Sequence, residues 1–372
     1  MTAPACIVEL SGVRVERGGV RVLDVPAFGI AEREIVALLG PNGAGKTSLL
    51  LSLMALLPRA AGRLLWRGAE VATARDALAA RRRMAMILQE PLLFDDTVEG
   101  NVASGLRLRG VRRAEARERV AAALARLGLG AIARRSARAL SAGEARRVSI
   151  ARALVLEPEV VLLDEPFANL DARTREAITD GLERTLRETG TAAVLVTHDP
   201  AEALRLSDRI AVMSGGAIVQ AGPPAEVVNE PASELVASYV GMETVLEGVV
   251  VRSAGGELVA SVAGRDVHAL GAASAGEAVY CCIRPEHVLV ESVDPSGSSS
   301  ARNVFPARVT AISPAGPYLK VKLDCGFPLV ASVTGESFAA LRLARGREVF
   351  ASFKATAIHV IRKGEAAPAR RG

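Results

Sequence analysis

A loop between two apolar runs is the feature that most constrains the fold of this chain. Residues 40–50 read GPNGAGKTSLL and follow the apolar run 35–39, IVALL. Glycines let successive backbone N–H groups turn inward, and a helix that starts after such a loop directs its positive end at the same point. Lys46 adds a full charge, and Thr47 offers a hydroxyl to a metal. The spacing predicts a phosphate-binding loop rather than a glycine-rich turn with a surface lysine, because strand, loop and helix follow in the required order.

The rest of the first 240 residues reads as strands that alternate with helices. Residues 97–155 show helical apolar spacing, and a further helix is expected over 48–57, where Pro58 would stop it. Three short apolar runs read as strands: 84–88, 160–166 and 192–199. Strands that are apolar throughout are typical of a mostly parallel sheet with both faces covered. The predicted fold class is therefore an α/β P-loop NTPase core.

The character of the chain changes near residue 241, where short β runs separated by Gly, Ser and Asp begin. Residues 276–290 resemble residues 346–361, and the segment 294–300 between them reads as a linker. We interpret this internal repeat as two small β-barrel modules in tandem, an all-β OB-like domain over 241–364. The tail 365–372 is expected to be disordered.

The composition of the chain limits the kinds of molecule that it is expected to bind. The chain has 372 residues, and its 46 basic and 41 acidic residues give a net charge of +5, which permits nucleic acid or an acidic membrane surface as a partner. Its arginines lie among glutamates, as in residues 112–120, and aromatics make up only 3%, so base stacking has no platform and no nucleic acid is expected. No uncharged run reaches the length of about 18 residues that a membrane-spanning helix needs, so a role at a membrane would require a partner.

The four cysteines carry little information about function. Cys6, Cys281, Cys282 and Cys325 form no C-x-x-C pair and have no histidine cluster beside them. We expect reduced thiols and no zinc site, with the adjacent Cys281 and Cys282 on opposite faces of a strand.

A pair of acids follows one of the apolar strands. The run VVLLDEP, residues 160–166, ends in Asp164 and Glu165. Cleavage of ATP requires a metal ion for the developing charge and a base for the attacking water. Asp164 is a candidate ligand of Mg²⁺, directly or through water, and Glu165 is a candidate to polarise the water. The alternative is that the pair caps a helix, which the loop upstream disfavours.

Four further segments resemble the ABC-type ATPases. The run LSAGEARRVSIARAL, residues 140–154, resembles their signature, and Gln89 in ILQEP resembles their Q-loop glutamine. The run NLDA, residues 169–172, resembles the D-loop, and His198 in VTHD resembles the switch histidine. The resemblance covers residues 5–240. It implies an ABC-type ATPase domain over 1–240 with a helical subdomain at about 90–158.

The resemblance also implies roles. Lys46, Glu165 and His198 would be catalytic, and Thr47, Gln89 and Asp164 would hold Mg²⁺. Ser141 and Gly143 would contact the γ-phosphate of ATP bound to a second copy, which implies a homodimer. The implied nucleotide-binding residues are Gly40, Pro41, Asn42, Gly43, Ala44, Gly45, Lys46, Thr47, Ser48, Gln89, Ser141, Gly143 and Asp171.

Three positions depart from the family pattern. Ala142 and Glu144 replace a glycine and a glutamine of the signature. Ala142 would lose the freedom of glycine at positive φ, and Glu144 would add negative charge near a phosphate unless it turns away, so closure around ATP is expected to be weaker. Arg17 stands where the family often stacks an aromatic ring on adenine. It would either stack through its guanidinium plane or lie exposed in solvent.

The second half resembles the β-barrel appendage of ABC importer ATPases in IRPEHV, residues 283–288. Residues 300–309 and 343–361 resemble small molybdate-binding domains. The resemblance implies the ATPase subunit of an importer for molybdate or tungstate, on the cytoplasmic face of the membrane. Its partners would be permease subunits and, indirectly, a substrate-binding protein. An importer of ferric iron, polyamine, sugar or sulfate, and a soluble ABC ATPase outside transport, remain alternatives.

A regulatory oxyanion site is the last expectation. An oxyanion is held by backbone N–H groups, hydroxyls and cations. The candidates in the second module are Ser300, Arg302, Ser332, Lys354 and Thr356. The alternative is that these are ordinary surface groups of a domain that only dimerises.

Overall fold

The computed structural model describes residues 6–296 and 299–364, so the tail expected at 365–372 lies outside the described residues. The chain divides into two compact units, Met1–Pro224 and Ala225–Arg370. The helices α8 (Pro224–Asn229) and α9 (Glu234–Tyr239) thus belong almost entirely to the second unit. A compact unit and a functional domain need not share a boundary, so the domain boundary at residue 240 stays a prediction.

A six-stranded sheet forms the centre of the first unit, in the order β10-β9-β3-β8-β7-β6. Five of its strands are parallel, and β10 runs antiparallel to β9. Every residue of β3, β7 and β8 is buried, as expected for strands covered on both faces. Their bounds are β3 (Ile35–Leu39), β6 (Met84–Ile87), β7 (Val160–Asp164), β8 (Ala192–Val196), β9 (Arg209–Ser214) and β10 (Ala217–Gly222). The predicted α/β core is confirmed.

An antiparallel sheet in the order β2-β1-β4-β5 completes the strands of this unit. Its bounds are β1 (Cys6–Arg17), β2 (Val20–Ala31), β4 (Ala61–Trp66) and β5 (Ala69–Glu70). Helix α1 (Lys46–Leu53) contributes Leu49, Leu50 and Leu53 to the core that joins the two sheets. The helix was expected over 48–57. It begins two residues earlier because Gly45 caps it, and it ends before Ala55, whose φ of 51° is left-handed.

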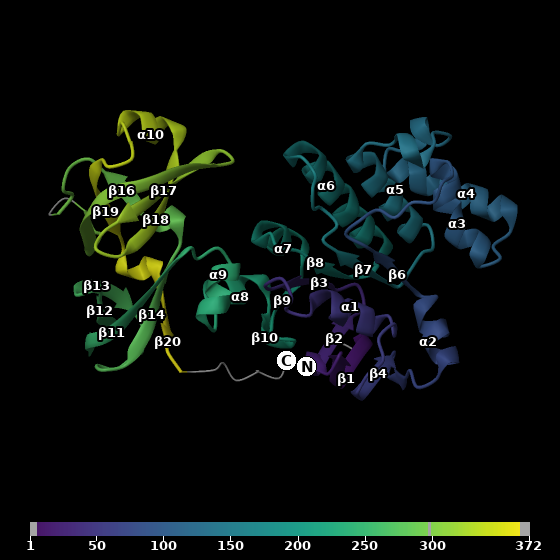
Figure 1. The fold of residues 1–372 in the computed structure, drawn as a ribbon, viewed down its shortest axis with the longest axis horizontal. Coiled ribbons are helices and arrows are strands. Elements are labelled where there is room, and N and C mark those ends of the chain that lie inside the picture. Colours follow the sequence, from purple (N-terminus) through teal and green to yellow (C-terminus); the bar gives the residue numbers. More distant parts are fainter. Residues whose placement is uncertain (1–5, 297–298, 365–372) are drawn as a thin grey trace. The chain divides into compact units, whose positions relative to one another are not determined.

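Helices form a second core on the other face of the parallel sheet, where buried residues of α3, α4, α5 and α6 pack against β6 and β7. Figure 1 shows α3, α4 and α5 gathered beside one another. The bounds of the helices are α2 (Ala74–Arg81), α3 (Val98–Leu108), α4 (Arg113–Arg126), α5 (Ala142–Leu154), α6 (Ala172–Thr189) and α7 (Pro200–Leu206). The helical segment expected at 97–155 is therefore present.

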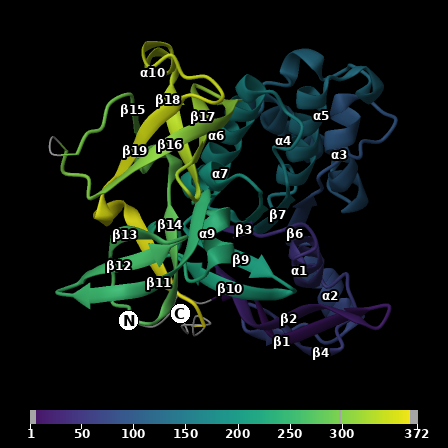
Figure 2. The same cartoon turned by 60° about the vertical axis from the view of Figure 1, so that its left-hand side comes forward.

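The second unit contains two five-stranded antiparallel sheets, in the orders β13-β12-β11-β14-β20 and β15-β19-β16-β17-β18 (Figure 2). One hydrophobic core joins them, with Phe305 packed against Phe327 and Phe353. The bounds are β11 (Thr244–Ala254), β12 (Glu257–Val262), β13 (Arg265–Leu270), β14 (Ala278–Ile283), β15 (Leu289–Glu291), β16 (Asn303–Ala315), β17 (Tyr318–Asp324), β18 (Pro328–Thr334), α10 (Gly335–Ala340), β19 (Glu348–Phe353) and β20 (Ile358–Arg362). The predicted all-β domain is confirmed.

The two modules exchange their last strands. β20, at the end of the second repeat, pairs with β14 of the first, while β15, at the end of the first repeat, pairs with β19 of the second. The two modules follow one another in the chain as predicted, and the structure adds that their sheets are interleaved. The two exchanged strands come from similar sequences, HVLV at 287–290 and IHVI at 358–361.

The adjacent cysteines of β14 face opposite ways, as expected. Cys281 belongs to the core between the two sheets, and Cys282 packs with Ala237, Met242 and Ile361. Both thiols are free, and burial raises the pKa of each to about 12.

The exchange predicts that the first module does not fold alone. A fragment of residues 225–296 lacks β20, so the edge of β14 would lose its partner strand. We expect this fragment to show no cooperative thermal unfolding by circular dichroism, whereas residues 225–364 should unfold in one transition. A cooperative transition of the short fragment would show that the exchanged strand is dispensable.

Candidate functional site

The loop between β3 and α1 forms the turn that its glycines predict. Gly45 is the N-cap of α1 with a φ of 97°, and a Cβ atom there would lie 2.8 Å from the carbonyl oxygen of Val22. Only glycine fits this position without strain. The loop residues of the predicted nucleotide site therefore lie together at the N-terminus of α1: Gly40, Pro41, Asn42, Gly43, Ala44, Gly45, Lys46, Thr47 and Ser48.

Lys46 lies inside this loop. Its Nζ donates to the carbonyl oxygens of Gly40, at 2.7 Å, and of Pro41, at 2.9 Å, and the residue is 7% exposed. Burial lowers the pKa of Lys46, and the carboxylates of Glu165 and Asp164 oppose that shift. The ammonium group thus holds the loop in a compact shape and lies near both acids.

Thr47 and Asp164 meet although 117 residues separate them. The Thr47 hydroxyl donates to Asp164 Oδ2 at 2.8 Å, at the carboxyl end of β7. Asp164 is 9% exposed; burial raises its pKa, and the hydrogen bond from Thr47 counteracts the rise. A hydroxyl beside a carboxylate is an oxygen donor set that suits Mg²⁺. Within the described residues, no group of three or more His, Cys, Asp or Glu side chains could hold a metal ion by itself.

Two side chains, those of Gln89 and His198, approach the carboxylate of Glu165, directly after β7. Glu165 Oε2 accepts a hydrogen bond from Gln89 Nε2 at 3.3 Å and lies 3.7 Å from His198 Nδ1. The backbone of Glu165 has a φ of 45°, and its N–H donates to the carbonyl oxygen of Val196 at 3.0 Å. A non-glycine residue in the left-handed region is strained, and such strain is common at functional sites. The structure therefore brings together Gln89, Glu165 and His198 from the ends of three neighbouring strands.

The signature segment begins helix α5. Ser141 is the N-cap, and its hydroxyl accepts from Glu144 N while Glu144 Oε2 accepts from Ser141 N at 2.8 Å. Glu144 also pairs with Arg135 at 3.0 Å, and the hydrogen bond from the Ser141 N–H lowers the pKa of Glu144. Glutamate and glutamine both close a capping box of this kind. Glu144 thus turns into the end of its own helix.

The other departure in the signature is also accommodated. Ala142 is the first residue of α5 and is not among the residues with positive φ, so the loss of glycine's freedom at this position causes no backbone strain in this structure. Gly143 is constrained by a neighbour instead, because a Cβ atom there would lie 2.6 Å from Thr174 Cγ2 on α6. Whether closure around ATP is weaker stays a prediction.

Asp171 lies beside the signature segment, as the N-cap of α6, where its carboxylate accepts from Thr174 N at 3.0 Å. Over residues 6–296 and 299–364, no hydrogen bond links Ser141, Gly143 or Asp171 to the loop 40–48. The predicted residues therefore form two groups, one around Lys46 and one at the start of α5. Arg17, at the end of β1, is exposed.

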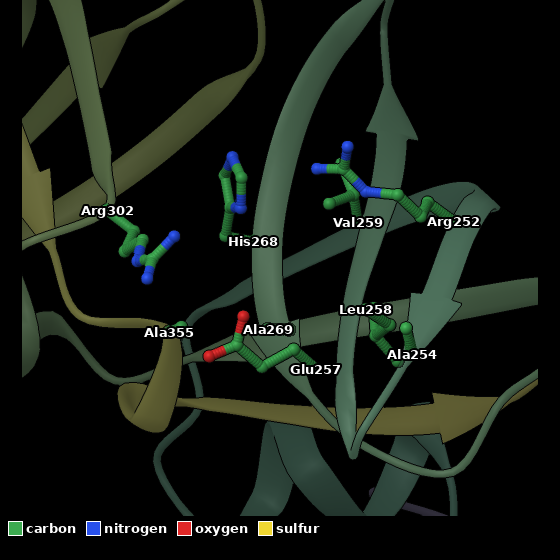
Figure 3. Close-up of a pocket in the computed structure, with 9 residues that line it drawn as sticks. All are labelled: Arg252, Ala254, Glu257, Leu258, Val259, His268, Ala269, Arg302 and Ala355. Atoms are coloured by element: carbon green, nitrogen blue, oxygen red, sulfur yellow. The ribbon is translucent and has the colours of Figure 1, made fainter.

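In the second unit, a cavity of about 170 Å³ receives one of the predicted oxyanion residues (Figure 3). Arg302 points toward it from the start of the second module, and Lys354 and Thr356 flank its lining residue Ala355. The lining residues are Arg252, Ala254, Glu257, Leu258, Val259, His268, Ala269, Arg302 and Ala355. Ser300 precedes Arg302 by two positions, while Ser332 lies on β18, separated from β19 in the sheet order by β16 and β17.

Sequence reasoning missed the residues that the first module contributes. Arg252, Glu257 and His268 lie on β11, β12 and β13, and no motif marks them. The sequence offers one signal nearby, the polar Asn303 directly after Arg302, and the structure shows that Asn303 is 1% exposed. Its amide accepts from His268 N and donates to His268 O, both at 2.8 Å, and so joins the edge strand β13 to the start of β16.

The fold and the loop define a P-loop ATPase core with a nucleotide-binding site at the carboxyl edge of its parallel sheet. Residues 23–168 match the ABC transporter model, and residues 299–360 match the TOBE domain. The chain belongs to the ABC transporter family and is one of its ATP-binding subunits.

Several known proteins are similar to it. The molybdate/tungstate import ATP-binding protein WtpC of Pyrococcus horikoshii is 39% identical over 344 residues, which cover 90% of this chain and 94% of the relative. The Fe(3+) ions import ATP-binding protein FbpC of Streptomyces coelicolor is 42% identical over 252 residues, or 68% of this chain and 72% of the relative. A solved ATP-binding cassette, in a dimeric post-hydrolysis state bound to ADP and Pi, is 27% identical, with a TM-score of 0.54 over 58% of this chain and 98% of the other.

None of the helices in the described part of the chain is long and apolar enough to cross a membrane.

The burial of the Asp164 carboxylate should lower the stability of the folded protein although hydrolysis of ATP needs this group. Burial raises the pKa of Asp164, so the folded state disfavours the charged carboxylate. The charged carboxylate therefore lowers the free energy of unfolding at a pH above its pKa in the folded state. This loss of stability disappears at a pH below its pKa in the unfolded state. Asp164→Asn should therefore raise the melting temperature of the nucleotide-free protein at pH 7 and abolish Mg²⁺-dependent hydrolysis.

The melting temperature of Asp164→Asn at low pH is the control for this prediction. At a pH below the ordinary aspartate pKa of about 3.9, Asp164→Asn and the original chain should unfold at the same temperature. A lower melting temperature of the variant at pH 7 would contradict the sign of this prediction.

Proposed function

We propose that this chain is the ATP-hydrolysing subunit of an ABC importer whose cargo is molybdate or tungstate. One observation carries the proposal: a chain that aligns with 94% of a molybdate/tungstate import ATP-binding protein also brings Thr47, Asp164, Gln89, Glu165 and His198 to one edge of its sheet. Ferric iron is the alternative cargo, because an Fe(3+) import relative matches over 68% of the chain. The molybdate/tungstate relative matches over 90% of the chain, whereas two Fe(3+) import relatives match over 68% and 79%, so more of the second unit aligns with the oxyanion importer, and this favours the oxyanion.

The residues present fit ATP and Mg²⁺. The turn closed by Gly45 leaves no room for a Cβ atom and suits a phosphate group at the start of α1. Thr47 and Asp164 would hold Mg²⁺, and Gln89 would complete the site. When bound, the ion neutralises charge that develops on the phosphate oxygens during transfer.

The chain's own groups would act as follows. Lys46 would leave the carbonyl oxygens of Gly40 and Pro41 and donate to the β- and γ-phosphate oxygens. Glu165 would accept a proton from the attacking water, and His198, whose Nδ1 lies 3.7 Å from Glu165, would orient the γ-phosphate against that water. Gln89 would give up its hydrogen bond to Glu165 and bind at the metal site instead. Glu165 would then be free to accept the proton of water only when the nucleotide is bound.

The site of one chain is incomplete. Ser141 and Gly143 lie at the start of α5 and make no hydrogen bond to residues 40–48 in the part of the chain that the structure describes. We propose that they contact the γ-phosphate of ATP held by a second copy, in a homodimer that closes over two nucleotides and opens after hydrolysis. The dimeric state of the solved cassette with ADP and Pi supports this arrangement.

The segment after Gln89 would face the permease. Leu92 is 60% exposed and Phe94 is 57% exposed, and both follow Gln89, which would respond to the bound nucleotide. Exposed apolar side chains next to a functional segment favour a protein partner. Docking there would hold the chain at the cytoplasmic face of the membrane, and a substrate-binding protein would act on it only through the permease.

The cavity of the second unit would sense the oxyanion. The guanidinium groups of Arg252 and Arg302 have no hydrogen bond or ion pair to another described residue, His268 lies between them, and Glu257 is the one acidic side chain of the lining (Figure 3). Unpaired guanidinium groups suit a bidentate contact with an oxyanion. We propose that Ser300, Lys354 and Thr356 assist, while Ser332 on β18 is the least supported of the candidates. A domain that only dimerises is the competing function.

Glu165→Gln tests the hydrolytic role. Loss of the base should lower ATPase turnover at least about a hundredfold, and ATP should accumulate in a stable dimer that light scattering detects. Glu188→Gln, an exposed change on α6, is the control and should keep full activity. Full turnover by Glu165→Gln, or by a strictly monomeric protein at every concentration, would contradict the proposal.

Calorimetric titration of the full chain with molybdate, tungstate and sulfate tests the sensing role. Arg302→Ala should weaken binding of molybdate and tungstate about tenfold or more, since a charged hydrogen bond contributes about 1.5–3 kcal/mol. Arg308→Ala on β16 is the matched control, because its guanidinium pairs with Glu348 at 3.2 Å and lies outside the cavity lining. The absence of heat with all three anions would support a domain that only dimerises.

A further inference from the structure

The first unit contains a buried arginine that the proposed mechanism does not use. Arg146 lies in the second turn of α5 and is 3% exposed. Its Nη1 donates to the carbonyl oxygen of Leu88 at 2.7 Å, and its Nη2 donates to the carbonyl oxygen of Gln89. No carboxylate forms an ion pair with it among the residues that the structure describes. Its partners are thus two successive backbone carbonyls of the segment that carries Gln89.

A purely structural role accounts poorly for this charge. Burial of a guanidinium group without an opposite charge is costly, and an apolar side chain of similar volume would fill the same space at lower cost. The planar fork of arginine, in contrast, can hold two adjacent acceptors in a fixed geometry. The arrangement therefore favours a role in fixing the backbone at 88 and 89.

A second arginine of the same helix extends the contact. Arg152 donates from Nη1 to the carbonyl oxygen of Leu92 at 2.6 Å, and its guanidinium lies 5.6 Å from the centre of the Phe94 ring. Gln89 and Leu92 have exposed side chains, so solvent surrounds the segment on one side while α5 holds its carbonyls on the other. Residues 88–94 are thus attached to α5 at three carbonyl groups.

Helix α5 also carries the signature residues at its start. Ser141 caps the helix, Gly143 lies in its first turn, and Arg146 follows one turn later. A displacement of the helix would therefore move the Gln89 backbone together with the signature residues. Gln89 in turn contacts Glu165 through its side chain at 3.3 Å.

We propose that Arg146 is a positioning residue: it makes Gln89 move as one body with the signature end of α5, so that closure around a partner's nucleotide and placement of the glutamine in the chain's own metal site occur together. This inference rests on the proposed ATPase function.

Three variants of the full-length protein test it. Arg146→Met removes both hydrogen bonds and keeps an unbranched side chain. Arg146→Lys keeps the positive charge but loses the planar guanidinium group that donates to two carbonyl oxygens at once. Arg109→Met is the matched control, because Arg109 is a half-buried arginine that donates to the carbonyl oxygen of Leu156 at 3.3 Å, at the far end of α5.

The first measurement needs no nucleotide. Hydrogen exchange of the amides in residues 88–94 should be faster in Arg146→Met than in the original chain, and unchanged in Arg109→Met. The second measurement is ATPase activity against Mg²⁺ concentration. Loss of an outer contact to a metal site typically costs about 10–100-fold in metal affinity or activity, so we expect a rise of that size in the Mg²⁺ concentration for half-activation, with unchanged affinity for ATP. Arg146→Lys should restore part of the loss.

The outcomes separate the two proposals. If Arg146→Met lowers the melting temperature but leaves both the exchange of 88–94 and the Mg²⁺ half-activation unchanged, Arg146 is only structural and the inference is wrong. If the original chain hydrolyses no ATP, the proposed function fails, and the exchange measurement still decides whether Arg146 holds the segment.

Discussion

The structure depends on the burial of opposite charges at the carboxyl edge of one parallel sheet. Lys46 and Asp164 are both more than nine-tenths buried, and the pKa of each shifts toward the neutral form because of that burial. The fold accepts this cost because the apolar strands β3, β7 and β8 hold the two groups at fixed positions. A site prepared in this way contributes little to stability, but the sheet already holds the charged groups at the edge where a phosphate would bind, so that only the side chains of Lys46 and Gln89 would change partners.

In the proposed homodimer, helix α5 would extend that site toward a second nucleotide. Its first turn carries Ser141 and Gly143, and the capping box with Glu144 keeps that turn ordered without a ligand. Its second turn carries Arg146, which holds the backbone of Gln89. One helix thus carries the signature residues and also holds the segment that contains Gln89.

The second unit shows how a repeat can give a single domain. Because β15 and β20 are exchanged, neither module can complete its sheet without the other. The cavity is lined by strands β11, β12 and β13 of the first module and by Arg302 and Ala355 of the second. Asn303 strengthens the joint through two hydrogen bonds to the backbone of His268. A ligand in the cavity would therefore contact the two modules at once, which suits a sensor better than a site within one module.

The sequence alone determined the class of fold, the phosphate-binding loop and the acids at Asp164 and Glu165. These depend on neighbours in the chain: the order of an apolar strand, a glycine-rich turn and a helix is a local property. Only the tertiary structure decided the rest. It paired Thr47 with Asp164, turned Glu144 into its helix end, exchanged the last strands of two similar repeats, and set Arg146 against Gln89. Each of these joins or separates groups by direction and distance in space, and no pattern of residue types along a chain encodes such a choice when several partners are chemically equivalent.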